Sequence, residues 1–112
     1  MILPNADKAV IPIEKLRDYC LNPLHKFGKH KARVFESALG LTMKDAGYLK
    51  DILLDKVKTQ DTIHINTNEF GDHYFIDFEL TVGEKKALLR SKWIIGHGVN
   101  YPRLTSCYVK RK

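Results

Sequence analysis

Cysteine is scarce in this chain of 112 residues, which contains only Cys20 and Cys107. Two cysteines cannot form a disulfide framework or a four-ligand zinc site. None of the five histidines stands at metal-ligand spacing from a cysteine or from paired carboxylates. We therefore expect reduced cysteines, no bound metal and no cofactor.

Long apolar segments are also absent. No apolar run approaches the ~20 residues that a membrane-spanning helix needs. Residues 1–7 have neither the basic part nor the hydrophobic part of a signal peptide. These absences predict a cytoplasmic protein with no membrane partner.

Acidic residues are fewer than basic ones: 13 Asp and Glu stand against 19 Lys and Arg, which gives a formal net charge of +6. An excess of positive charge favours an anionic partner, most often nucleic acid, although lysine also serves solubility alone. The apolar share of 44% and the charged share of 29% are those of a globular protein. The length predicts one domain over residues 1–112.

The spacing of apolar residues changes near residue 62 from helical to strand-like. Intervals of three and four predict three helices, over residues 12–21, 28–40 and 43–58. Alternation predicts four strands, a turn at 66–72 and a frayed basic tail at 110–112; the strands cover residues 62–65, 73–80, 86–95 and 103–109. This order predicts an α+β fold in which three N-terminal helices pack on one face of a four-stranded antiparallel sheet.

The start of the predicted helix 28–40 carries the densest group of polar side chains, namely Lys29, His30, Lys31 and Arg33. A histidine among three cations at a helix start suits a phosphate, because the helix dipole adds positive potential there. The simpler alternative is a solvated helix start.

Alternation also sorts the side chains of the last two strands. It places Leu88, Arg90, Lys92 and Ile94 on one face and Leu89, Ser91, Trp93 and Ile95 on the other. On the last strand it separates Thr105, Cys107 and Val109 from Leu104, Ser106 and Tyr108, with Arg103 at the start. Arg90 and Lys92 form either a positive binding surface or a solvated face. Trp93 and Tyr108 either stack on bases or, more commonly, belong to the core.

No nucleophile motif, phosphate-binding loop or zinc-protease motif occurs in the chain. The remaining chemistry, of histidine, cations and hydroxyls, fits metal-free cleavage of RNA, in which the 2′-hydroxyl is the nucleophile. We expect His30 to be the acid or base, with His73 as a weaker alternative. The other expected catalytic residues are Lys29, Arg90 and Thr105, and the expected substrate-binding residues are Lys31, Arg33, Lys92, Trp93, Arg103 and Tyr108.

Several stretches together resemble an uncharacterised bacterial domain, which occurs alone and at the C-termini of polymorphic toxins and phage-head-associated proteins. These stretches are LPNADKAV (3–10), KLRDYCLN (15–22), GKHKARVFESALG (28–40), DFEL (77–80), RSKWII (90–95) and YPRLTSCYV (101–109). More coarsely, the layout resembles the barnase, EndoU, colicin and RelE group of ribonuclease toxins. Lys29 with His30, Arg90, and the run from Thr105 to Tyr108 stand in comparable places. The resemblance implies a ribonuclease toxin whose partners are RNA, with tRNA as a candidate, and a small acidic antitoxin or immunity protein.

Two other classes of protein fit the same sequence. The first is a non-catalytic protein, either a basic nucleic-acid-binding module or an immunity or accessory protein. The net charge of +6 opposes an immunity role, because inhibitors of nucleases tend to be acidic. The second is a housekeeping α+β domain whose charge serves solubility.

Overall fold

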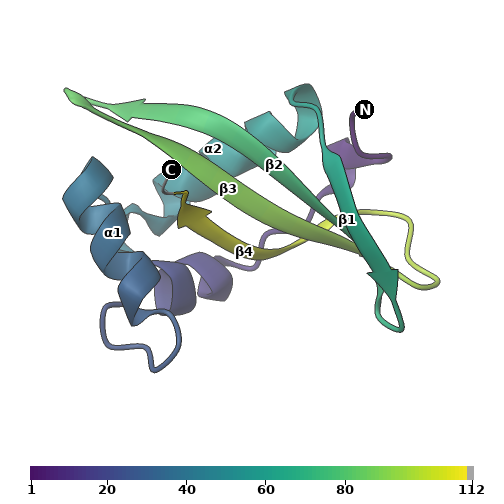
Figure 1. Ribbon diagram of the computed structural model, residues 1–112, viewed down its shortest axis with the longest axis horizontal. Helices are drawn as coiled ribbons and strands as arrows, with labels where there is room; N and C mark the ends of the chain where they lie inside the picture. The colour runs from purple at the N-terminus through teal and green to yellow at the C-terminus, as the bar shows by residue number, and fades with distance from the viewer. Residues whose placement is uncertain (111–112) are drawn as a thin grey trace.

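The computed structural model describes residues 1–110 (Figure 1). In chain order the elements are η1 (Ala6–Lys8), η2 (Lys15–Cys20), α1 (Lys29–Leu39), η3 (Met43–Asp45), α2 (Ala46–Thr59), β1 (Ile63–Asn68), β2 (Gly71–Val82), β3 (Lys85–Gly96) and β4 (Arg103–Val109). The α+β class and the four-stranded antiparallel sheet, of order β1-β2-β3-β4, are confirmed. The expected set of three helices is wrong in detail, because η2 has π-helical geometry, η1 and η3 are short 3-10 turns, and α1 and α2 are the two α-helices.

The predicted turn at residues 66–72 is shorter in the structure. Asn66, Thr67 and Asn68 continue β1 and pair with residues 71–73 of β2, so the turn itself needs only Glu69 and Phe70. Asparagine and glycine gave this segment the composition of a loop, but the pairing with β2 satisfies its backbone. The next hairpin is regular, and β2 pairs with β3 from Gly71 opposite Gly96 to Val82 opposite Lys85.

The predicted faces of β4 are also wrong, because the strand contains a bulge at Thr105. Lys92 pairs with Ser106 and Trp93 pairs with Leu104, which leaves Thr105 as the extra residue. The bulge shifts the alternation by one residue. Leu104 therefore faces the core together with Cys107, whereas Ser106 and Tyr108 lie on the other face of the sheet.

One hydrophobic core joins the inner face of the sheet to the helices. The sheet contributes Ile76, Phe78, Leu80, Leu89, Trp93, Leu104 and Cys107, and the helical segments contribute Leu16, Cys20, Phe35, Leu39, Leu49, Leu53 and Val57. Within the core the Trp93 indole N–H donates to the Ser91 hydroxyl at 2.9 Å, and that hydroxyl donates to the carbonyl of Ile76 at 3.3 Å. Both cysteines are buried free thiols, and burial, together with the neighbouring Cys20, raises the pKa of Cys107 well above its usual value.

The helices are short, and α1 lies against β3 and β4 (Figure 1). Among residues 1–110, no helix has both the length and the apolar character that crossing a bilayer requires. The N-terminal arm meets the start of β4, where Val10 donates to the carbonyl of Pro102 at 2.9 Å and accepts from Leu104 at 3.0 Å. These bonds hold η2 beside β4.

Candidate functional site

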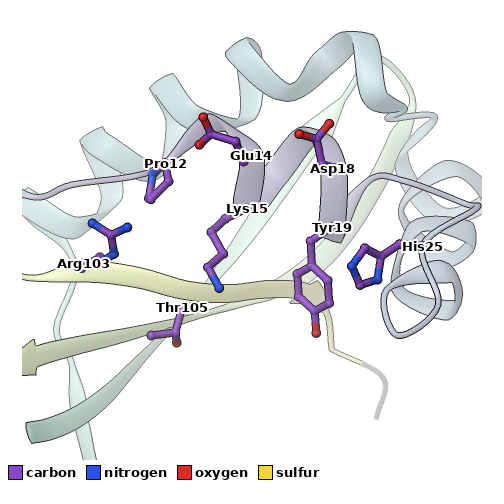
Figure 2. Close-up of a pocket in the computed structure, with 8 residues that line it drawn as sticks. All are labelled: Pro12, Glu14, Lys15, Asp18, Tyr19, His25, Arg103 and Thr105. Carbon is purple, nitrogen blue, oxygen red and sulfur yellow. The ribbon is translucent and has the colours of Figure 1, made fainter. Parts of the chain in front are cut away.

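A groove of about 620 Å³ runs between η2 and β4 (Figure 2). Its lining residues are Pro12, Glu14, Lys15, Asp18, Tyr19, His25, Arg103 and Thr105. Figure 2 shows the side chains of Lys15 and Tyr19 extending from η2 toward β4, with the Lys15 amine near Thr105 and the His25 ring beside Tyr19. The groove thus gathers amine, guanidinium, imidazole and hydroxyl groups together with two carboxylates.

The two faces of η2 explain why Lys15 and Tyr19 project into the groove. Leu16 and Cys20 are fully buried in the core, and each follows one of these two groove residues in the sequence. Burial of the apolar pair fixes the rotation of the segment, so the polar pair must face β4. Glu14 and Asp18 also line the groove, and in Figure 2 their carboxylates point away from the side chains of Lys15 and Tyr19. Asp18 is also paired there with Arg17 at 2.8 and 2.9 Å.

His25 is held by the backbone of its own loop. Its Nδ1 accepts hydrogen bonds from the amides of Phe27 at 3.0 Å and Gly28 at 2.9 Å. Its ring packs edge-on against Tyr19, with the ring centroids 4.9 Å apart. Because Nδ1 accepts, we infer that the proton of the neutral ring is on Nε2, which makes His25 a hydrogen-bond donor.

Gly28 permits this arrangement. A Cβ atom at this position would lie 2.2 Å from the carbonyl oxygen of Tyr19, so a side chain would push the loop away from η2. The close approach of Gly28 to Tyr19 sets the place of His25 at the end of the groove.

Lys31 extends the groove toward the open face of the sheet. Its Nζ donates to the Tyr19 hydroxyl at 3.0 Å and lies 5.8 Å from the ring centroid of Tyr108. The Nζ of Lys92 also lies 5.8 Å from the centroid of the same ring. The half-buried Tyr108 therefore has an amine on α1 and an amine on β3 close to its ring.

Arg90 is already neutralised by a carboxylate. Its guanidinium donates to Asp77 at 2.8 and 2.9 Å and stacks on the ring of Phe75 with 3.8 Å to the centroid. These hydrogen bonds lower the pKa of Asp77, partial burial opposes the shift, and the charges of Arg90 and Lys110 add to it. Arg90 is therefore paired with Asp77, and its catalytic role stays a prediction.

The chain matches the family model of a domain of unknown function, DUF6883, over residues 2–111. The chain belongs to the DUF6883 family. This membership confirms the resemblance to an uncharacterised domain family, whereas the likeness to the ribonuclease toxin group stays a prediction. No curated protein matches the chain.

In this DUF6883 chain the residues predicted on α1 do not form one site. The buried side of α1 consists of Ala32, Phe35 and Leu39. The side chains of Lys29, His30 and Arg33 lie on the outer side of this helix and are exposed. Within residues 1–110 their side chains have no hydrogen bond or salt bridge. No hydrogen bond joins His30 to Arg90 or Thr105 within these residues, and the catalytic role of His30 stays a prediction.

The other predicted residues divide between the core and the groove. Trp93 is 1% exposed and faces the core, so it is not available for stacking on a base. Arg103 and Thr105 line the groove, and the Thr105 hydroxyl donates to the carbonyl of Lys92 at 3.2 Å. His73, the weaker alternative, lies at the β1–β2 hairpin, where its Nε2 is 3.1 Å from Asn68 Oδ1.

Six of the eight residues that line the groove were not predicted as site residues, and Lys15, Tyr19 and His25 are the three among them on which the proposed chemistry depends. Lys15 and Tyr19 come directly before Leu16 and Cys20, the buried residues of η2. The apolar spacing of this segment could therefore have placed both side chains beside its buried face. His25 stands in a loop between Pro23 and Gly28, where no periodicity points to it.

Among residues 1–110 no group of three or more His, Cys, Asp or Glu side chains is placed to hold a metal ion. Of the predicted frayed tail, Lys110 lies 3.4 Å from Asp77, and residues 111–112 lie outside the described chain.

Proposed function

We propose that the protein binds RNA in the groove between η2 and β4 and cleaves it by attack of the 2′-hydroxyl on the adjacent phosphate, as a ribonuclease toxin. The observation that carries this proposal is the meeting of Lys15, Tyr19 and His25 with Arg103 and Thr105 in one groove. The toxin role is supported by the resemblance of the sequence to toxin-associated domains, and the net charge of +6 supports an RNA substrate.

The proposed phosphate position lies among cations and neutral donors. Lys15 and Arg103 line the groove. Lys31 lies at the end of the groove, where its amine donates a hydrogen bond to the Tyr19 hydroxyl. The Nε2–H of His25 would donate to a non-bridging oxygen, as a neutral imidazole can without changing its own protonation. Such fixed donors stabilise the charge that grows on the phosphorane.

Tyr19 is the proposed acid of the reaction. Its oxygen accepts from Lys31 at 3.0 Å, so its own proton is free to be donated elsewhere. In the proposed step the bond from O2′ to phosphorus forms and the bond from phosphorus to O5′ breaks. Tyr19 protonates the leaving O5′, and solvent water takes the proton of the 2′-hydroxyl. The products are a 2′,3′-cyclic phosphate and a 5′-hydroxyl, and no metal enters the step.

Replacement of the Tyr19 hydroxyl tests this proposal. Wild-type protein should cleave a labelled RNA in the presence of EDTA, and Tyr19→Phe should lower the rate about a hundredfold, the size of a lost general acid. Tyr48→Phe is the matched control, because Tyr48 lies exposed on α2, outside the groove. Equal rates for Tyr19→Phe and Tyr48→Phe, or cleavage that EDTA abolishes, would contradict the proposal.

The two histidines distinguish the groove from the outer side of α1. His30→Gln should keep the wild-type rate, whereas His25→Gln should reduce it at least tenfold, which corresponds to the loss of about one hydrogen bond to a charged group. A lower rate for His30→Gln together with a wild-type rate for His25→Gln would indicate that His30 is the catalytic histidine, and it would refute the groove as the active site.

Binding without cleavage is the second candidate function. It is favoured by the two backbone amides on His25 Nδ1, which occupy that nitrogen and leave the ring only Nε2 for contact with RNA. Retention of RNA on the protein with no product, at any time of incubation, would select this candidate.

A small acidic antitoxin or immunity protein is the proposed protein partner. The cations Lys15, Lys31, Lys92 and Arg103 would face its carboxylates, and opposite charges speed association at low salt. An association rate that does not change with salt would contradict an interface over this groove.

A further inference from the structure

The loop between η2 and α1, residues 22–28, exposes two large apolar side chains on either side of His25. Leu24 is 90% exposed and Phe27 is 71% exposed. Because the two side chains lie in water, they bury little apolar surface and add little to the stability of the fold. One of the two, Phe27, is aromatic and lies next to the groove.

The position of Phe27 is fixed by the loop. Its backbone amide donates to His25 Nδ1, and the carbonyl of His25 accepts from the amide of Lys29 at 3.0 Å. The Phe27 ring consequently lies 6.1 Å from the His25 ring, between centroids, at an interplanar angle of 53°. The Nζ of Lys26 lies 5.5 Å from the Phe27 centroid. An exposed ring, a cation and the groove histidine are thus held together.

We propose that Phe27 is a stacking surface for an unpaired nucleobase, and that the substrate of the groove is therefore single-stranded RNA. This inference rests on the proposed function, which places the neighbouring phosphate beside His25. A base next to that phosphate meets the ring of Phe27, and Lys26 lies close enough to contact the following phosphate. A duplex keeps its bases stacked inside the helix and presents no open face to a side chain.

Base stacking on an aromatic ring is worth about 1–3 kcal/mol and tolerates any base, because every base has a π-face. The expected preference is consequently for strandedness and not for sequence. The same energy predicts that removal of the Phe27 ring weakens binding about five- to a hundredfold.

The test measures binding and not cleavage. The probe is a short 2′-O-methyl RNA, which cannot be cleaved by its own 2′-oxygen, used single-stranded and as a duplex with its complement, with fluorescence anisotropy as the readout. Phe27→Ala should weaken the binding of the single strand about five- to a hundredfold and leave the affinity for the duplex unchanged. Phe27→Trp should bind the single strand with the affinity of the wild type. A 2-aminopurine in the probe should be quenched by wild-type protein and not by Phe27→Ala.

Phe70→Ala is the matched control. Phe70 is 67% exposed and stands in the turn between β1 and β2, and Figure 1 shows this turn on the opposite side of the molecule from α1. Equal affinities of Phe27→Ala and Phe70→Ala for the single strand, or equal affinity of the wild type for both probes, would overturn the stacking role. Binding that depends on Phe27, in a protein that cleaves no RNA, would refute only the proposed reaction. No binding of either probe by the wild type would overturn both.

Discussion

The Asp77 carboxylate on β2 accepts two parallel hydrogen bonds from the guanidinium of Arg90, which stands directly opposite it on β3. The pair lies on the face of the sheet away from the main core, and both side chains are about three-quarters or more covered, at 20% and 26% exposure. The ring of Phe75 covers the guanidinium. A two-pronged ion pair of this kind is stronger than an exposed one.

We predict that Asp77→Asn destabilises the protein by about 1–2 kcal/mol at neutral pH, the range of hydrogen bonds to a charged group reduced by partial solvent screening. Urea unfolding measures the free energy. Glu79→Gln is the control, because Glu79 and its partner Lys86 are both about 60% exposed. An exposed pair contributes about 0–1 kcal/mol.

The same pair predicts a pH dependence. Arg90 lowers the pKa of Asp77 in the folded protein, so the stabilisation is complete above the unfolded pKa of about 4 and is lost as the pH falls through the lower folded value. The free energies of wild type and Asp77→Asn should therefore differ at pH 7 and converge in strong acid. A difference that stays constant down to strong acid would show that the carboxylate charge is not the cause.

The buried indole of Trp93 gives a third prediction. Ser91→Ala removes the acceptor of its N–H, and a buried donor left without a partner costs about 1–3 kcal/mol. Because Trp93 is the only tryptophan, its fluorescence reports both the unfolding and any local change. Ser37→Ala, on the exposed side of α1, should change stability by less than about 0.5 kcal/mol. Equal stability of the two variants would show that the indole finds another partner.

The sequence predicts the sheet well because its strands alternate cleanly. Ile76, Phe78, Leu89 and Trp93 lie on the inner face as the alternation requires. The bulge at Thr105 breaks this rule on β4, and one extra residue has no signature in a pattern of period two. Leu104 and Ser106 were consequently predicted on one face and lie on opposite faces.

The candidate site was harder to predict than the fold. Local composition draws attention to His30, which has three cations beside it in the sequence. Its place on the outer side of α1 is set by which residues of the helix enter the core. His25 reaches the groove through a loop whose course depends on tertiary hydrogen bonds and on the close packing of Gly28 against Tyr19. Contacts of this kind join residues that no local pattern links.

Lys31 gives a fourth prediction, on the electrostatics of RNA binding. Lys31→Gln should weaken RNA binding and reduce the slope of log affinity against log salt by about one, because one phosphate contact is lost. Lys29→Gln removes the same charge from the outer side of α1 and should change the slope much less. Titrations at several salt concentrations measure both. The same slope for the two variants would mean that RNA does not distinguish the groove side of α1 from its outer side.

Two glycine substitutions should change the protein in opposite directions. At Gly28 an added Cβ would lie 2.2 Å from the Tyr19 carbonyl oxygen, so Gly28→Ala should destabilise the fold by about 1–3 kcal/mol, the range for overpacking. It should also lower RNA affinity, because it moves His25 and Phe27 together. At Gly47, on α2, the added methyl meets nothing within 4 Å, and Gly47→Ala should stabilise the protein by up to about 1 kcal/mol through helix propensity, with RNA affinity unchanged. Urea unfolding and anisotropy on both variants test the pair. A Gly28→Ala protein with wild-type stability and wild-type affinity would show that the approach of the loop to η2 does not position the groove.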